Sequence, residues 1–237
     1  MKHRKHGFQR PFTNDQMLSW VAEPIAAVMF YLVVATFTFG DQRIVYLSVY
    51  SVLLAAHLVC WLLCSLLDPS VDEGCFWPCM KEAQKEKRYC AVCHKSVIGL
   101  DHHCTWLNTC IGKRQYPWFF SLVAIGFIMF WFETILFILL LTKLFTDEVS
   151  AKALDVFNSV TTYKVLVSLC VVFAGGLAIA LSVLFVFHLF LQFTGMGTYA
   201  WMIDGRNKKV AKKKAQKQNT VQSEANVEQA SKTVSNV

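Results

Sequence analysis

Charged residues are scarce in this 237-residue chain: they make up 16% of its positions, while hydrophobic residues make up 55%. Soluble domains usually contain about 25% charged and about 45–50% apolar residues. There are too few polar side chains to cover the surface of a soluble core. This composition excludes an ordinary soluble protein. Lipid must form part of the surroundings of this chain.

Cysteine is too infrequent for a disulfide scaffold, with nine residues in the whole chain. Three of the nine, Cys60, Cys64 and Cys170, lie in apolar runs, where we expect buried and unreactive thiols. The short apolar core and small-residue cleavage pattern of a cleaved signal peptide are also missing before the first long hydrophobic run. We therefore predict that this run is a retained signal anchor.

Four stretches are long and apolar enough to cross a bilayer, which requires about 20 helical residues. We predict spans over residues 17–39, 44–67, 118–141 and 165–193. Glu133 lies about 22 Å into the third span at about 1.5 Å per residue. An ionisable group at that depth is a functional candidate. It lines an apolar cavity, pairs with His57 or His188, or is simply a protonated glutamate near the luminal end, and the sequence leaves these alternatives open.

Basic residues set the predicted orientation of the spans. Nineteen of the 23 Lys and Arg residues lie in the N-terminal arm, in residues 68–117 or in the tail from Arg206 onward. The positive-inside rule therefore predicts that both termini and the middle loop are cytosolic, in a multi-pass protein of the endomembranes (ER or Golgi) or the plasma membrane. In that reducing compartment the cysteines of the loop should be thiols or metal ligands.

The tail, residues 205–237, is rich in Lys, Ala, Gln, Ser and Asn and shows no apolar periodicity. We predict that it is disordered. Its basic opening either attracts anionic lipid headgroups or serves only to orient the last span. Because the basic charge follows the membrane boundary, we expect no nucleic-acid partner.

The middle loop, residues 68–117, is near the size at which a metal usually supplements a small core. It contains a Cys-x-x-Cys pair, Cys90 and Cys93, followed by His103 and Cys110. Four soft sulfur and nitrogen donors with this spacing are typical of a tetrahedral zinc site. The predicted fold class is therefore all-α integral membrane, with four transmembrane helices and a small zinc-binding cysteine-rich cytosolic domain between spans two and three.

Three further groups surround one of these ligands in the sequence Asp101–Cys104. If His103 binds the metal, His102 remains free beside the thiol of Cys104. Cysteine attacks as a thiolate, an adjacent imidazole can take its proton, and a carboxylate can orient that imidazole. Asp101, His102 and Cys104 are thus the candidate catalytic residues. The spacing leaves open a second interpretation, in which His102 and Cys104 are also metal ligands in a purely structural site.

These residues carry a resemblance to a known family. Asp101–Cys104, Trp106, Asn108 and the Cys-Ile-Gly sequence that ends at Gly112 resemble the DHHC cysteine-rich domain of protein S-acyltransferases (palmitoyltransferases). The resemblance extends to the Asp-Pro pair that begins at Asp68, to Tyr116 and Phe119, and to the four-span topology. The resemblance covers most of the chain outside the tail and the luminal loops.

The resemblance implies a two-step acyl transfer. A long-chain acyl-CoA, commonly palmitoyl-CoA, would acylate Cys104 as a thioester, and a cysteine of a membrane-associated protein would then take the acyl group. His102 would act as the base and Asp101 would orient it, while His103 would bind zinc with the three other ligands. The fatty chain would lie among the spans in the bilayer.

The sequence departs from the family pattern at its second zinc site. Tyr89 and Ser96 stand where further ligands are usual, and Cys75 and Cys79 do not have the spacing to replace them. We therefore predict one structural zinc ion and not two.

Other departures lie outside the ligand set. Thr105 replaces a proline, Gln115 replaces an asparagine, and Ala200 stands where the family's Thr-Thr-x-Glu motif has its glutamate. The missing glutamate and the missing second zinc site motivate an alternative, a catalytically impaired zinc-binding membrane adaptor of the same family. A small transporter is disfavoured, because no span shows the broken-helix pattern of substrate sites.

Overall fold

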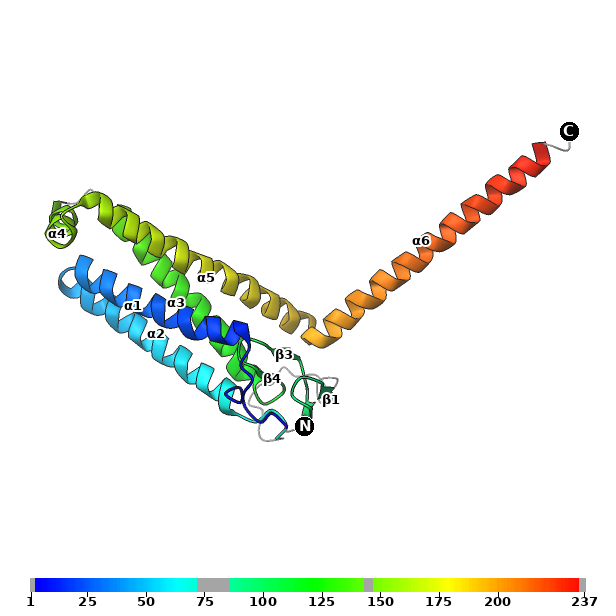
Figure 1. Cartoon of the computed structure of the whole chain (residues 1–237), viewed down its shortest axis with the longest axis horizontal. Helices are drawn as coiled ribbons and strands as arrows, with labels where there is room; N and C mark the ends of the chain where they lie inside the picture. The colour runs from blue at the N-terminus through cyan, green and yellow to red at the C-terminus, as the bar shows by residue number, and fades with distance from the viewer. Residues whose placement is uncertain (1–2, 72–85, 143–146, 235–237) are drawn as a thin grey trace. The chain divides into compact units, whose positions relative to one another are not determined.

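The computed structural model describes residues 3–71, 86–142 and 147–234, with side chains as far as residue 220. It divides into two compact units, Met1–Gly195 and Met196–Val237. The first unit contains a helical bundle with a small loop domain at one end (Figure 1). The second contains one helix.

Four helices of the first unit are long and apolar enough to cross a membrane. They are α1 (Asn14–Phe37), α2 (Gly40–Leu66), α3 (Tyr116–Thr142) and α5 (Val160–Thr194). The four predicted spans are thus confirmed, but α5 begins earlier than predicted. The hydroxyl of Ser159 accepts a hydrogen bond from the backbone N–H of Thr162 at 3.2 Å and caps a polar first turn that hydropathy alone does not reveal.

Helix α3 packs against both α2 and α5 and forms the centre of the bundle. Aromatic side chains fill much of the core: the rings of Phe30 and Tyr50 stack with 3.7 Å between their centroids, and Phe137 belongs to the same cluster. The three cysteines of the apolar runs, Cys60, Cys64 and Cys170, are buried free thiols, as predicted.

Glu133 does not pair with either of the histidines that we considered. Its side chain is fully buried, and neither carboxylate oxygen has a hydrogen-bond partner among the described residues. His57 instead lies 3.8 Å from the carboxylate of Glu23, and His188 contacts Tyr116. Of the alternatives that the sequence left open, the structure does not show the pairing, because His57 and His188 lie beside other partners.

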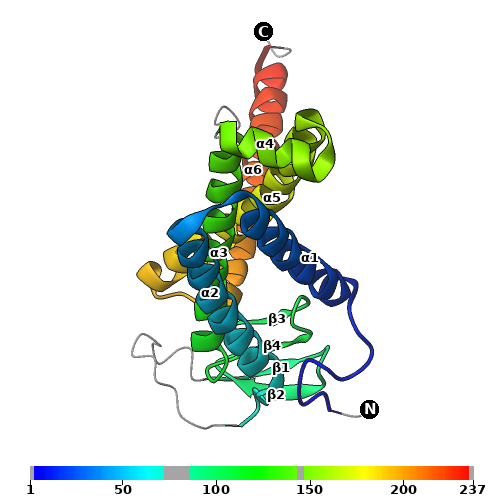
Figure 2. The same ribbon diagram turned by 90° about the vertical axis from the view of Figure 1, so that its left-hand side faces the viewer.

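The loop between α2 and α3 forms two antiparallel hairpins. Strand β1 (Lys87–Cys90) pairs with β2 (Lys95–Ile98), and β3 (His102–Cys104) pairs with β4 (Thr109–Ile111). His94 and Asn108, at the two turns, have positive φ angles of 51° and 53°. Both hairpins lie at the end of the bundle that carries the N-terminal arm (Figure 2). Cys75 and Cys79 lie outside the described residues.

Two further helices occur where the sequence suggested none. Helix α4 (Asp147–Phe157) lies in the far loop and has Asp147 and Glu148 in its first turn, where negative charge favours a helix. Helix α6 (Thr198–Val234) includes most of the tail that we predicted to be disordered. That prediction is wrong over this range, because the tail beyond Gly205 is rich in the helix formers Lys, Ala and Gln and contains no Gly or Pro.

Candidate active site and metal centre

The structure brings the four predicted metal ligands together. The ligand atoms of Cys90, Cys93, His103 and Cys110 all lie within 4.8 Å of one another. Nδ1 of His103 lies 3.8, 3.3 and 3.8 Å from the three sulfur atoms in that order. Tetrahedral zinc with Zn–S and Zn–N bonds of about 2.3 and 2.0 Å requires sulfur–nitrogen separations of about 3.5 Å. The cluster therefore has the donor set and the size that zinc requires.

The two hairpins explain how these ligands converge. Cys90 ends β1 and Cys93 lies in the following turn, where its backbone N–H donates to the sulfur of Cys90 at 3.4 Å. His103 and Cys110 are direct partners in the β3–β4 register. Each hairpin thus contributes two donors to one buried point between them.

The charge of this cluster also suits a cation. Burial by itself would lower the pKa of His103, but its hydrogen bonds with Cys90 and Cys93 raise the pKa to about 9. A divalent metal bound between the four donors would take the place of that proton.

His102 and Cys104 lie on the other face of β3. Successive residues of a strand point to opposite sides, so the neighbours of His103 turn away from the metal cluster. Cys104 is not part of that cluster in the described residues, and its side chain is 8% exposed. The sequence left open a structural site with Cys104 as a ligand, and the strand geometry disfavours it.

Asp101 and His102 form the close contact that a general base requires. Nδ1 of His102 lies 2.8 Å from a carboxylate oxygen of Asp101, whose side chain is only 4% exposed. The backbone N–H of Asp101 donates to the carbonyl of Ile111 at 2.8 Å, which holds the carboxylate in position. Burial lowers the pKa of His102, but the hydrogen bonds with Asp101 and Cys104 outweigh it and raise the pKa to about 9. His102 therefore binds a proton more tightly than an isolated histidine does.

Side chains of α3 and α5 form the wall beside His102. The ring of Phe119 meets His102 edge-on at 5.2 Å, and the ring of His188 lies 6.0 Å from it. The hydroxyl of Tyr116 lies 3.3 Å from Nδ1 of His188, which is 2% exposed. Sequence reasoning did not connect His188 with this site, although a histidine inside an apolar span is a signal in itself.

A comparison with family models now bears on this geometry. The model of the DHHC palmitoyltransferase family matches residues 72–205, more than half of the chain. This chain belongs to the DHHC palmitoyltransferase family. The metal-ligand cluster and the Asp101–Cys104 segment of this DHHC protein both lie within the matched region.

Relatives with curated names agree with this membership. The chain is 28% identical over 131 residues to "Probable protein S-acyltransferase 20" of Arabidopsis thaliana, covering 53% of this chain and 18% of that protein. It is 29% identical over 128 residues to "Probable protein S-acyltransferase 15" of the same plant, covering 54% and 47%. It is 33% identical over 115 residues to "Palmitoyltransferase ERF2" of Kluyveromyces lactis, covering 48% and 28%. The matched region is thus less than half the length of each of these relatives.

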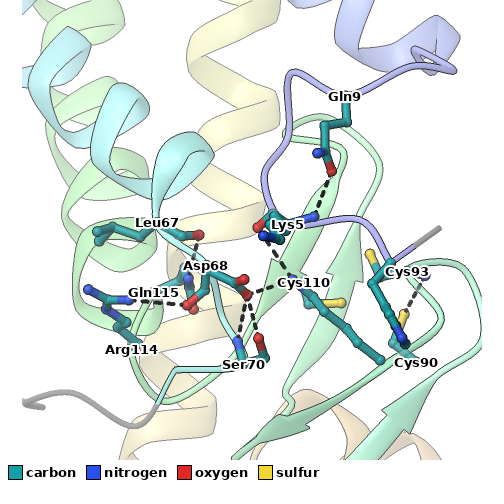
Figure 3. Close-up of polar contacts among 12 residues, drawn as sticks. Lys5, Gln9, Leu67, Asp68, Ser70, Cys90, Cys93, Cys110, Arg114 and Gln115 are labelled. Atoms are coloured by element: carbon teal, nitrogen blue, oxygen red, sulfur yellow. Dashed lines mark hydrogen bonds and ion pairs between the residues drawn. The ribbon is translucent and has the colours of Figure 1, made fainter.

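Two basic residues near the DHHC segment contact Asp68. Lys95 is 7% exposed, and its ammonium group lies 2.9 Å from a carboxylate oxygen of Asp68. It therefore has a structural partner and is not offered to a ligand. The guanidinium group of Arg114 donates to the backbone carbonyl of Asp68 at 3.3 Å, as Figure 3 shows.

The substitution at Gln115 also has a structural explanation. Its side chain is fully buried, and its amide donates to the carbonyl of Leu67 at 2.9 Å (Figure 3). It joins the start of α3 to the end of α2, just below the hairpins. Sequence reasoning treated this residue only as a departure from the family pattern.

Proposed function

We propose that this chain is a protein S-acyltransferase that moves a long-chain acyl group, such as palmitoyl, from acyl-CoA to cysteines of membrane-associated proteins. The observation that carries the proposal is the separation of two neighbouring histidines. His103 faces three thiols, while His102 faces a carboxylate and the thiol of Cys104. One buried cysteine is therefore left outside the ligand set and beside a base.

The proposed chemistry has two thioester exchanges. Cys104 gives its proton to His102, and its sulfur attacks the acyl carbonyl carbon of acyl-CoA. The carbon–sulfur bond to CoA breaks, and CoA leaves with a proton from His102. In the second step a substrate cysteine loses its proton to His102, and its sulfur attacks the carbonyl carbon of the Cys104 thioester. The carbon–sulfur bond to Cys104 breaks, and the proton returns from His102 to the sulfur of Cys104.

Asp101 has a supporting role in this proposal. Its hydrogen bond with Nδ1 leaves Nε2 of His102 as the nitrogen that exchanges protons with sulfur. Its buried carboxylate also stabilises the positive charge that His102 gains in each step. Zinc held by Cys90, Cys93, His103 and Cys110 would act as a structural staple, since all four positions around the metal would be filled by protein ligands.

The membrane setting supports an acyl donor of this kind. Cys104 belongs to a hydrophobic cluster with Cys60 and Cys64 of α2 and with side chains of α3, so it lies where the bundle meets the loop. A fatty chain attached there could enter the apolar surroundings of the spans. The positive-inside pattern supports a cytosolic position for this end, where acyl-CoA and the substrate cysteines would approach.

Labelled palmitoyl-CoA tests the proposal. The purified full chain, loaded with zinc, should acquire a hydroxylamine-labile label, and Cys104→Ser should abolish it. Cys60→Ser is the matched control, because Cys60 is a buried thiol of the same cluster and is not among the metal ligands. It should keep the label. A label that persists in Cys104→Ser contradicts the assigned nucleophile.

The same experiment separates the enzyme from the alternative function. The absence of the motif glutamate at Ala200 favours a zinc-binding membrane adaptor without turnover. The adaptor predicts a folded protein with bound zinc and no acyl intermediate in the unchanged chain. The enzyme predicts both the zinc and the intermediate.

A further inference from the structure

The N-terminal arm, residues 3–13, lies against the first hairpin of the cysteine-rich loop. The backbone N–H of Arg4 donates to the carbonyl of the metal-ligand residue Cys93 at 3.2 Å. The ammonium group of Lys95 donates to the carbonyl of Lys5 at 3.3 Å. The arm therefore follows the turn that holds two of the thiols.

The same arm also holds the second hairpin. The side-chain amide of Asn108 donates to the carbonyl of Pro11 at 3.0 Å and to the carbonyl of Gly7 at 3.4 Å. The guanidinium group of Arg4 donates back to the carbonyl of Asn108 at 3.3 Å. Asn108 is 1% exposed, so these bonds form away from water and join the arm firmly to the β3–β4 turn.

The end of the arm reaches the residue that follows Cys104. The hydroxyl of Thr13 donates to the carbonyl of Thr105, and the hydroxyl of Thr105 donates to the carboxylate of Asp15, each at 2.5 Å. Thr13 is also the N-cap of α1, where it accepts from the backbone N–H of Gln16 at 3.2 Å. The first turn of a membrane-spanning helix is thus bonded directly to the turn beside Cys104.

Gly7 shows how closely the arm fits. Its N–H donates to the carbonyl of Ser65 in α2 at 2.8 Å, and its carbonyl accepts from the side-chain amide of Gln16 at 2.9 Å. A β-carbon at this position would lie 2.1 Å from the carbonyl oxygen of Leu107. Only glycine fits there, because the arm passes directly between the bundle and the β3–β4 turn.

The metal site alone does not hold this turn. Its ligands on this hairpin, His103 and Cys110, are paired across the strands, and the turn lies beyond them, away from the metal. Strands of three residues form a weak ladder, and an isolated hairpin is marginally stable in water. Cys104 lies at the turn end of that ladder, opposite Thr109.

We infer that residues 3–13, together with Thr105 and Asp15, form a positioning strap that holds the Cys104 turn against the membrane bundle. The strap does not touch the reacting atoms. The strap fixes the backbone of the turn that follows Cys104. The metal ligand His103 fixes the backbone that precedes it. Its role in acyl transfer rests on the proposed function, whereas its role in ordering the turn does not.

Thr105 is the position at which the strap can be tested most cleanly. Its hydroxyl donates to a carboxylate, and valine has the same shape without that donor. Thr105→Ser keeps the hydroxyl and should rescue the contact. Thr109→Val is the matched control, since the buried hydroxyl of Thr109 has no hydrogen-bond partner among the described residues and lies on the same hairpin.

The experiment measures two quantities on the zinc-loaded full chain in detergent. Backbone hydrogen exchange of residues 105–108 should become about two- to tenfold faster in Thr105→Val, as expected for the loss of one hydrogen bond. Gly7→Ala should accelerate it more, because the whole arm is displaced. Formation of the Cys104 thioester should slow in both variants at unchanged zinc content. Thr105→Ser and Thr109→Val should match the unchanged chain in both measurements.

The outcomes separate the strap from the proposed function. Unchanged exchange in both Thr105→Val and Gly7→Ala, with zinc retained, overturns the strap even if the thioester forms normally. Faster exchange with normal thioester formation overturns its positioning role. Faster exchange in a protein that never acquires an acyl label upholds the ordering of the turn by the strap and counts against the S-acyltransferase alone.

Discussion

His102 and His103 are neighbours with different surroundings, and the difference comes from a single strand. Alternation along β3 turns His103 toward three thiols and His102 toward a carboxylate. Each histidine therefore has its own partners: His103 faces the three thiols of the cluster, and His102 faces the carboxylate of Asp101 and the thiol of Cys104. The two roles are not interchangeable, although the residues are identical.

The same alternation predicts that two buried cysteines differ in their effect on metal binding. Cys93→Ser should weaken zinc binding more than about 100-fold, since loss of even an outer partner of a metal ligand weakens binding about 10–100-fold. Cys104→Ser should leave zinc content unchanged, because Cys104 lies outside the cluster. Metal analysis of the purified variants by mass spectrometry measures both. Equal loss of zinc from the two variants would make Cys104 a ligand and remove the nucleophile.

At the scale of elements, one ion pair joins the end of α2 to strand β2. Asp68 follows α2 and accepts from the N–H and the hydroxyl of Ser70 at 2.9 and 2.6 Å. The same carboxylate oxygen lies 2.9 Å from the ammonium group of Lys95, which is almost fully buried. A buried cation that loses its partner is strongly destabilising. This pair therefore fixes the loop domain on the span that precedes it.

Replacement of Asp68 tests this connection and its pH dependence. Burial raises the pKa of Asp68, but hydrogen bonds from Ser70 and Lys95 outweigh it and lower the pKa below its ordinary value of 3.8. The stabilisation should therefore be present above about pH 4 and disappear as the pH falls through the lowered pKa. Asp68→Asn should reduce the free energy of unfolding by about 2–4 kcal/mol at neutral pH, and the difference should shrink in acid.

Thermal melts in detergent at several pH values measure this difference. Asp155→Asn is the matched control: Asp155 also lies 2.9 Å from a lysine, Lys152, but its side chain is 70% exposed. Exposed pairs contribute little to stability, so this variant should melt like the unchanged chain. A pH-independent loss in Asp68→Asn would assign the effect to packing and not to charge.

At the scale of the first unit, the bundle and the loop domain are stabilised by different means. The bundle has a continuous apolar core that extends over α1, α2, α3 and α5. The loop domain has a core of only a few buried side chains, and three of these are the metal-ligand cysteines. We therefore expect so small a core to depend on a bound metal, as small metal-binding domains do.

Removal of the metal should therefore unfold one part and leave the other. A strong zinc chelator should increase hydrogen exchange across residues 87–111, while α3 and α5 stay protected and the helical circular dichroism changes little. Protection should return when zinc is added back. Simultaneous loss of protection in α3 and α5 would contradict this division and would make the metal part of the stability of the bundle.

The N-terminal arm shows where prediction from the sequence ends. Its basic residues indicated orientation, and nothing in their spacing indicated that Arg4 and Gly7 contact residues about a hundred positions later. From the sequence, Thr105 could likewise be described only as a departure from the family pattern. Its bond with Asp15 depends on how the loop folds back on α1, and such long-range contacts leave no local periodicity.

The four spans and the metal-ligand set were determined by the sequence itself, because hydropathy and the spacing of donors are local properties that survive any arrangement of the helices. The carboxylate, imidazole and thiol of the Asp101–Cys104 segment could be proposed as a catalytic group for the same reason. Only the tertiary structure decided that His102 and Cys104 turn away from the thiols, that His188 and Tyr116 lie beside His102, and that the arm contacts the turn beside Cys104. These features depend on strand alternation and on contacts between distant segments, which form only when the chain folds.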